Sequence, residues 1–293
     1  MRIEVAGGHI NAVVDGEGPL VLLIHGFPEG AWAWRHQLPA LATAGYRTVA
    51  IDVRGYGGSF APDGVEAYQM LAHVADNVAI VRALGAGAAV VIGHDWGSPI
   101  ATASAQVRPD VFTAVGMLGV PYTPRGELPP AFPPDFYVGH FQAPGVAEAE
   151  IEADVAGWLR RFYAALTDDT PGWFGVPMQL PDAPLPDWVA DFDAIVATFE
   201  RNGFAGPLNR YRNFTRDWED LAAFDGPRQP AIFITGERDG TRRWLGEAIE
   251  RQSEWLPGLT GAHVIDDCGH WVQQERPEQV NALLLDFLER VRS

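Results

Sequence analysis

The chain contains no lysine and only one cysteine among its 293 residues. Without a lysine, no Schiff-base intermediate can form on the protein. With Cys268 alone, no internal disulfide can form, which is typical of a reducing compartment, and we expect a cytoplasmic protein. Cys268 precedes His270 by two residues, so a thiol nucleophile is one alternative. A small buried side chain is the role more typical of a free cysteine.

Long apolar runs and basic residues are also scarce. No segment approaches the roughly 20 apolar residues of a membrane helix, and the first residues do not predict a signal peptide. The 21 basic residues, all arginine, face 38 acidic ones, which gives a net charge of −17. Such a charge disfavours nucleic acid and anionic lipid as partners. No Gly-x-Gly-x-x-Gly follows a strand near residue 25 or 93, and we predict no cofactor and no metal.

Short apolar strands alternating with helical patterns are the main feature that is present. Candidate strands are residues 20–24, 47–51, 88–92, 114–118, 231–236 and 262–265. Helical patterns occupy residues 35–44, 67–84 and 277–291. Strands separated by helices predict an α/β fold with a mostly parallel sheet that helices cover on both faces.

The middle of the chain differs in composition. Residues 121–144 contain seven prolines, too many for a strand or a long helix. Helical patterns follow from 147 to 166, at 187–202 and at 207–217. The sequence therefore predicts a core made of residues 1–120 and 225–293, interrupted by a helical cap over 121–224. The cap carries four tryptophans that suggest an apolar lining: Trp158, Trp173, Trp188 and Trp218.

The segment Gly93-His94-Asp95-Trp96-Gly97 joins a buried strand to an alanine-rich helix. This pattern is typical of the nucleophile elbow, a strained turn with little room for Cβ atoms beside the central residue. A carboxylate at the centre, in place of a serine, indicates attack on an sp³ carbon. The positive end of the following helix dipole favours the ionised form of Asp95. The alternative is an aspartate that only caps the helix.

His270 and Asp239 are the candidate partners of Asp95. The order nucleophile, acid, histidine along the chain is that of the α/β-hydrolase fold. Because Asp95 needs no activation, His270 would deprotonate the water that hydrolyses a covalent ester; a packed structural histidine is the alternative. Asp239 follows the strand 231–236 and would orient the His270 ring. Three other carboxylates compete for this role: Glu237, Asp266 and Asp267.

The loop His25-Gly26-Phe27-Pro28 follows the first candidate strand. In this fold that loop supplies one backbone N–H of the oxyanion hole, and the residue after the nucleophile supplies the other. These positions are Phe27 and Trp96. We assign structural roles to His25 and His94.

These segments together resemble the epoxide hydrolases of the α/β-hydrolase superfamily, and the resemblance spans nearly the whole chain. The matching strings are HGFPE at 25–29, DVRGYGGS at 52–59, GHDWG at 93–97, DCGHWVQQERPEQVN at 267–281, FQAPGVAEAEIE at 141–152 and GFAGPLNRYRN at 203–213. The last two lie in the predicted cap and are the most specific, since dehalogenases share HGFP and GHDWG.

The resemblance implies two cap tyrosines that supply a proton to the opening epoxide. Tyr211 matches one and Tyr137 the other, although Tyr163 or Tyr122 could be mistaken for Tyr137. A phenol, with a pKa near 10, stays protonated at neutral pH. The resemblance also implies an aromatic pocket wall made of Phe27, Trp34 and Trp96, and hence a neutral, lipophilic epoxide as the small-molecule partner.

The chain departs from the family pattern at two positions. Arg210 stands where the common string Asn-Trp-Tyr-Arg has tryptophan, and Gly30 stands where serine is frequent. Neither position carries a chemical role in the family.

Two other functions compete with epoxide hydrolysis. A haloalkane or haloacetate dehalogenase uses the same Asp-His-Asp groups, but haloalkane enzymes often carry asparagine where this chain has Phe27. Haloacetate enzymes carry HDRxxR where this chain has HDWGSP at 94–99. The second alternative is a binding module without activity on the same fold. Inactive relatives tend to lose one of the reactive residues, and this chain has all of them. We therefore expect an enzyme that converts an epoxide and water to a vicinal diol.

Overall fold

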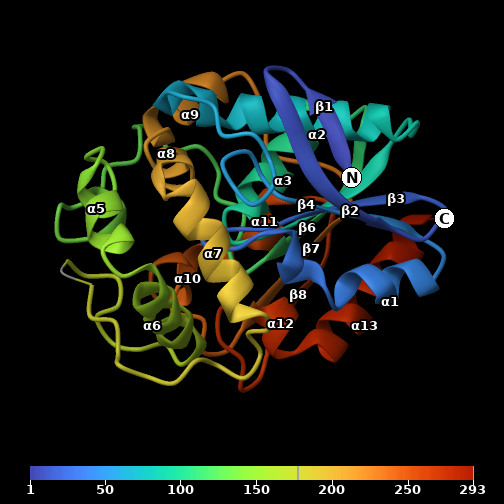
Figure 1. Cartoon of the computed structure of the whole chain (residues 1–293). Helices are drawn as coiled ribbons and strands as arrows, with labels where there is room; N and C mark the ends of the chain where they lie inside the picture. The colour runs from blue at the N-terminus through green and yellow to red at the C-terminus, as the bar shows by residue number, and fades with distance from the viewer. Residues whose placement is uncertain (177, 293) are drawn as a thin grey trace.

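The computed structural model describes residues 1–176 and 178–292, and its centre is an eight-stranded sheet with the order β1-β2-β4-β3-β5-β6-β7-β8 (Figure 1). The strands are β1 (Arg2–Val5), β2 (Gly8–Asp15), β3 (Leu20–Ile24), β4 (Arg47–Ile51), β5 (Ala89–His94), β6 (Phe112–Leu118), β7 (Ala231–Gly236) and β8 (Leu259–Ile265). Strands β3 to β8 pair in parallel, which confirms the predicted mostly parallel sheet.

Strands β1 and β2 were not expected from the sequence. They pair antiparallel with each other, and β2 pairs antiparallel with β4 at the edge of the sheet. In β1 and β2, buried residues are separated by residues that are partly or fully exposed, whereas every residue of β3 and β5 is buried. Continuous apolar runs identify central strands, whereas a partly exposed edge hairpin gives a weaker signal.

Helices cover both faces of the sheet (Figure 1). On one face α1 (Gln37–Thr43) and α13 (Pro277–Arg292) pack in a cluster with Val21 and Leu23. On the other, α2 (Met70–Ala83) and α3 (Gly97–Val107) pack in a larger cluster with Leu22 and Ile24. Successive strand residues point to opposite faces, so each central strand contributes to both clusters.

The segment between β6 and β7 forms a group of helices on one side of the sheet (Figure 1). They are α4 (Tyr137–His140), α5 (Val146–Glu152), α6 (Val155–Thr167), α7 (Phe192–Asn202), α8 (Ala205–Tyr211) and α9 (Phe214–Asp220). Short helices follow β7, namely α10 (Arg242–Glu250), α11 (Gln252–Trp255) and α12 (Val272–Glu275). The single-turn helices η1 (Ala31–Trp34) and η2 (Val65–Tyr68) complete the described elements.

Two of the predicted helices in this segment are each divided in two. The helix expected over 147–166 is divided into α5 and α6. Asp154 lies at the break and caps α6 by accepting a hydrogen bond from the Gly157 N–H. The helix expected over 207–217 divides into α8 and α9. An apolar period continues through such a break, so periodicity alone does not locate it. Within residues 1–176 and 178–292, no helix is long and apolar enough to span a bilayer.

Candidate active site

Asp95 occupies the sharp turn between β5 and α3. Its φ of 50° lies in the left-handed region, where a non-glycine residue is strained. The two flanking glycines are sterically required, because a Cβ on Gly93 would lie 1.9 Å from the Gly97 carbonyl oxygen. A Cβ on Gly97 would lie 2.0 Å from the Ile24 carbonyl oxygen. The predicted elbow geometry is therefore present.

The Asp95 carboxylate points away from its own helix. Its Oδ1 accepts the Phe27 backbone N–H at 2.8 Å, and its Oδ2 lies 3.4 Å from His270 Nε2. The N-cap of α3 is Trp96, with no side-chain cap hydrogen bond. The alternative in which Asp95 merely caps the helix is therefore wrong.

His270 lies between two carboxylates. Its Nδ1 is 3.1 and 3.0 Å from the two carboxylate oxygens of Asp239. Asp239 in turn accepts hydrogen bonds from the Thr241 N–H at 3.0 Å and the Thr241 hydroxyl at 2.8 Å. The competing carboxylates of Glu237, Asp266 and Asp267 are not buried, and Asp267 forms exposed ion pairs with arginines. Geometry therefore selects Asp239.

The three groups shift one another's pKa. Burial alone would lower the pKa of His270, but the Asp239 and Asp95 carboxylates raise it well above the ordinary value for histidine. Burial opposes ionisation of Asp95 and of Asp239, but the interaction with His270 lowers the pKa of both carboxyl groups overall. The site therefore holds a cationic imidazole between two anions at neutral pH.

A second buried layer supports the His270 backbone. His94 Nε2 lies 2.9 Å from the His270 carbonyl oxygen, and its Nδ1 lies 2.8 Å from Glu29. Glu29 also accepts hydrogen bonds from the side chains of Gln274, at 2.7 Å, and Gln273. We did not identify Glu29 from the sequence, although it ends the motif HGFPE. A carboxylate directly after the mainly apolar loop that follows β3 was the available signal.

The other structural assignments fit their surroundings. His25 Nε2 accepts the Val53 N–H at 3.0 Å and so holds the neighbouring loop. Cys268 is fully buried in the core cluster around α13, and burial raises the pKa of its thiol, which opposes the thiolate form of a nucleophile.

Tyr137 and Tyr211 come together over this site from α4 and α8. Their ring centroids are 6.1 Å apart, and both rings contact the edge of Phe141. Tyr211 also packs 5.0 Å from Trp96 and 5.4 Å from Phe27. Burial raises the pKa of both phenols, so both remain protonated at neutral pH.

The two alternative tyrosines lie elsewhere. The Tyr163 hydroxyl donates to the Pro28 carbonyl at 2.7 Å and therefore holds the oxyanion loop. Tyr122 is half-buried near Gln252, whose side chain bonds both the N–H and the carbonyl of Tyr122.

Phe27 is the centre of an aromatic cluster. Besides Tyr211, four rings meet it edge to face at 5.7 to 6.3 Å between centroids: Phe141, Trp158, Phe162 and Phe204. All four come from the segment between β6 and β7 and were not named from the sequence as site residues, except that Trp158 was expected to line the cap. An apolar residue in a helical pattern gives no sign of which ring it will meet.

Comparisons with known proteins agree with this geometry. Residues 19–277 match the alpha/beta hydrolase fold family. Epoxide hydrolase A of Mycobacterium tuberculosis is 40% identical, over 98% of this chain and 96% of its own length. An epoxide hydrolase structure from an endophytic Streptomyces superposes with a TM-score of 0.96 at 53% identity, over 100% of this chain and 95% of that one. The chain belongs to the epoxide hydrolase family of α/β hydrolases.

A second solved structure, Epoxide Hydrolase A from Mycobacterium thermoresistibile, has a TM-score of 0.90 and 40% identity, covering 99% of this chain and 97% of its own.

One residue that we predicted to line the pocket does not lie there. Trp34 is fully buried in the cluster with α1 and α13, on the face of the sheet opposite Phe27, so its assignment to the pocket wall is wrong. Spacing within the motif could not reveal which face its ring would occupy.

Proposed function

We propose that this protein hydrolyses a neutral, lipophilic epoxide to a vicinal diol through a covalent ester on Asp95. The observation that carries the proposal is the placement of the Asp95 carboxylate, with one oxygen on the Phe27 N–H and the other facing His270. In this proposal residues 121–224 act as a cap over a core of residues 1–120 and 225–293, and the cap brings Tyr137 and Tyr211 to the nucleophile.

In the first step, the Asp95 carboxylate attacks a ring carbon and the carbon–oxygen bond of the epoxide breaks. The departing oxygen becomes an alkoxide and takes a proton from Tyr137 or Tyr211. Because burial keeps both phenols protonated, either can hold the ring oxygen by a hydrogen bond before the bond breaks.

Esterification neutralises Asp95, so only Asp239 still raises the pKa of His270; that pKa falls, and His270 gives its proton to the phenolate left by the first step. In the second step, water adds to the ester carbonyl and the neutral His270 takes one of its protons. The bond between the carbonyl carbon and the ester oxygen on the substrate carbon then breaks, and the released alkoxide takes the remaining water proton to complete the diol, which leaves Asp95 ionised. The backbone N–H groups of Phe27 and Trp96 would stabilise the oxyanion on the Asp95 carboxyl group. Each turnover consumes one epoxide and one water.

The surroundings of the two phenols favour a neutral substrate. Aromatic rings surround Phe27, and Tyr211 packs among them. An apolar pocket with a few convergent polar groups selects apolar ligands and orients them by those groups.

A single-turnover reaction in water enriched in heavy oxygen tests the covalent route. With enzyme in excess over styrene oxide, the first diol should carry unlabelled oxygen, because that oxygen comes from Asp95, and repeated turnovers should then introduce the label. A first diol that is fully labelled would contradict the ester. Incubation with 1-bromobutane tests the dehalogenase alternative, and we expect no release of bromide.

A further inference from the structure

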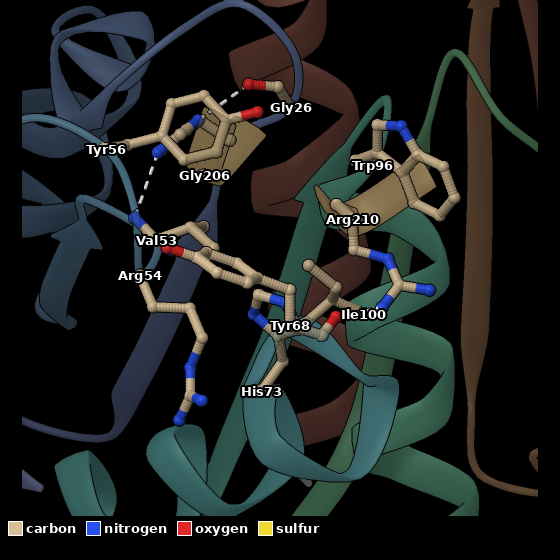
Figure 2. Close-up of a pocket in the computed structure, with 11 residues that line it drawn as sticks. Gly26, Val53, Arg54, Tyr56, Tyr68, His73, Trp96, Ile100, Gly206 and Arg210 are labelled. Atoms are coloured by element: carbon tan, nitrogen blue, oxygen red, sulfur yellow. Dashed lines mark hydrogen bonds between the residues drawn. The ribbon is translucent and has the colours of Figure 1, made fainter. Parts of the chain in front are cut away.

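Arg210 is a buried cation at a position where the family commonly has tryptophan. It lies in α8, directly before Tyr211, and is 3% exposed. Its NH1 donates to the Tyr68 carbonyl, its NH2 pairs with the Asp217 carboxylate, and its Cζ lies 4.8 Å from the centre of the Trp96 ring. Figure 2 shows the Arg210 side chain beside Trp96.

These contacts join two helices of the insertion to the core. Asp217 lies in α9, and its second carboxylate oxygen accepts the N–H of Met70, the first residue of α2, at 2.6 Å. Tyr68 ends η2 and is separated from α2 by one residue, Gln69. A buried charge is stable only where hydrogen bonds and a counter-charge compensate for its lost hydration. The Arg210–Asp217 pair meets that requirement only while α8 and α9 are seated on the start of α2.

Arg210 also contacts the Trp96 ring, which packs against Tyr211. The Arg210 guanidinium lies over the Trp96 ring, and the centroid of that ring is 5.0 Å from that of Tyr211, with 87° between the ring planes. A cation over an indole face is attracted by its negative potential, which restricts the ring. Arg212, which follows Tyr211 in the chain, bonds Glu148 at 2.7 Å and the Phe141 carbonyl at 2.9 Å, and both of these partners lie in the insertion.

The space beside Arg210 is too small for a ligand. The cavity that Arg210 lines with Tyr56, Tyr68 and His73 measures about 10 Å³ (Figure 2), whereas ligand pockets measure roughly 300 Å³ or more. The charge of Arg210 therefore serves the packing of the protein and not the binding of an anionic substrate.

We propose that Arg210 is a positioning residue for the ring-opening step: with Asp217, it fixes α8 and the Trp96 ring against the core so that the Tyr211 phenol meets the epoxide oxygen. This inference rests on the proposed function of Tyr211. The Arg210 guanidinium supplies a directional link to Asp217 and Tyr68.

Transient kinetics with styrene oxide, followed by tryptophan fluorescence, separate formation of the ester from its hydrolysis. For Arg210→Met we expect ester formation to slow by about tenfold, because a small displacement of a donor has a large effect on rate. Hydrolysis of the ester should change by less than about twofold, since His270 and Asp239 lie on core loops. Arg210→Lys, which keeps a charge near Asp217, should recover part of the lost rate.

Arg54→Met is the matched control. Arg54 forms an equally buried pair with Asp76, at 2.7 Å, but its partner lies within the core helix α2. This variant should lower the melting temperature without slowing ester formation selectively. Equal effects of the two methionine variants on both steps would overturn the inference. If Arg210→Met does not fold, Asp217→Asn replaces it. We expect this variant also to slow ester formation more than ester hydrolysis, and equal effects on both steps would overturn the inference.

The Tyr211→Phe background separates this inference from the proposed function. If Tyr211→Phe slows ester formation and Arg210→Met has no further effect in that background, Arg210 acts through Tyr211. If Tyr211→Phe is slow but Arg210→Met alone is as fast as the parent, the positioning role fails and the proposed function stands. If Tyr211→Phe itself is fully active, the proposed donor fails.

Discussion

The core and the insertion hold their reactive groups in different ways. Asp95 follows β5 directly, and Asp239 and His270 lie on the loops after β7 and β8. All three are charged, and each accepts or donates hydrogen bonds with neighbouring groups. Tyr137 and Tyr211 are neutral, lie on helices of four and seven residues, and are surrounded mainly by aromatic rings.

This difference follows from the cost of burying each kind of group. A buried charge needs hydrogen bonds and partners, which backbone loops at strand ends provide in fixed positions. A buried phenol is largely apolar, so aromatic packing can hold it while its hydroxyl stays available. In the proposed mechanism the core supplies the nucleophile and the base for ester hydrolysis, and the insertion supplies the proton for ring opening. Each of these roles can be tested separately.

Removing the core base should have the largest effect. In His270→Gln we expect ester formation to continue while hydrolysis falls by about 10³- to 10⁴-fold, because no general base remains. Mass spectrometry of the intact protein after mixing with styrene oxide should show the mass of one added substrate. A variant that turns over without accumulating this adduct would break the assignment of the second step to His270.

Removing the phenols should affect the other step. We expect Tyr137→Phe and Tyr211→Phe each to slow ester formation by roughly 10- to 100-fold, and the double variant by about 10³-fold, since two donors share one oxygen. Stopped-flow fluorescence measures this rate. Tyr122→Phe is the control, because that half-buried tyrosine packs beside Gln252 and has no role in the proposed mechanism, and it should match the parent. An active double variant would remove the tyrosines from the mechanism.

A smaller effect should follow from weakening the support behind His270. Glu29→Gln keeps the shape of the side chain but removes the anion beside His94, and we expect hydrolysis of the ester to slow by about tenfold. Glu148→Gln is a matched control, since Glu148 is a buried carboxylate paired with Arg212 in the insertion. Steady-state and single-turnover rates should show that Glu29→Gln slows hydrolysis of the ester and that Glu148→Gln does not. If both variants slowed the same step, the difference between the core and the insertion would be contradicted.

The smallest effect concerns stability and pH. The pKa of His270 is raised in the folded protein above its unfolded value of 6.5. Its charge therefore stabilises the fold fully below about pH 6.5, and this stabilisation disappears as pH rises through the folded pKa. We expect the difference in melting temperature between the parent and His270→Gln to shrink as the pH rises above about 6.5 and through the folded pKa of His270. A constant difference would show that no such cationic histidine contributes.

The sequence predicted the parallel strands closely, and β3, β4 and β7 have the predicted bounds. It missed the β1–β2 hairpin and the breaks at Asp154 and between α8 and α9, because weak alternation and capping leave little trace in apolar periodicity. Of the predicted pocket residues, Phe27 and Trp96 lie beside Tyr211, whereas Trp34 lies on the other face of the sheet. Motif matching locates a loop, but backbone direction decides where each ring points.

The sequence by itself determined the candidate groups and their order: an aspartate at the centre of a Gly-x-Asp-x-Gly turn, a later acid and a last histidine, because the steric and chemical demands of the elbow are local. Only the tertiary structure decided which carboxylate faces His270, which tyrosines meet above Asp95, and that Arg210 links the insertion to α2. These are contacts between residues far apart in the chain, and they depend on how packed helices and strands place side chains in space.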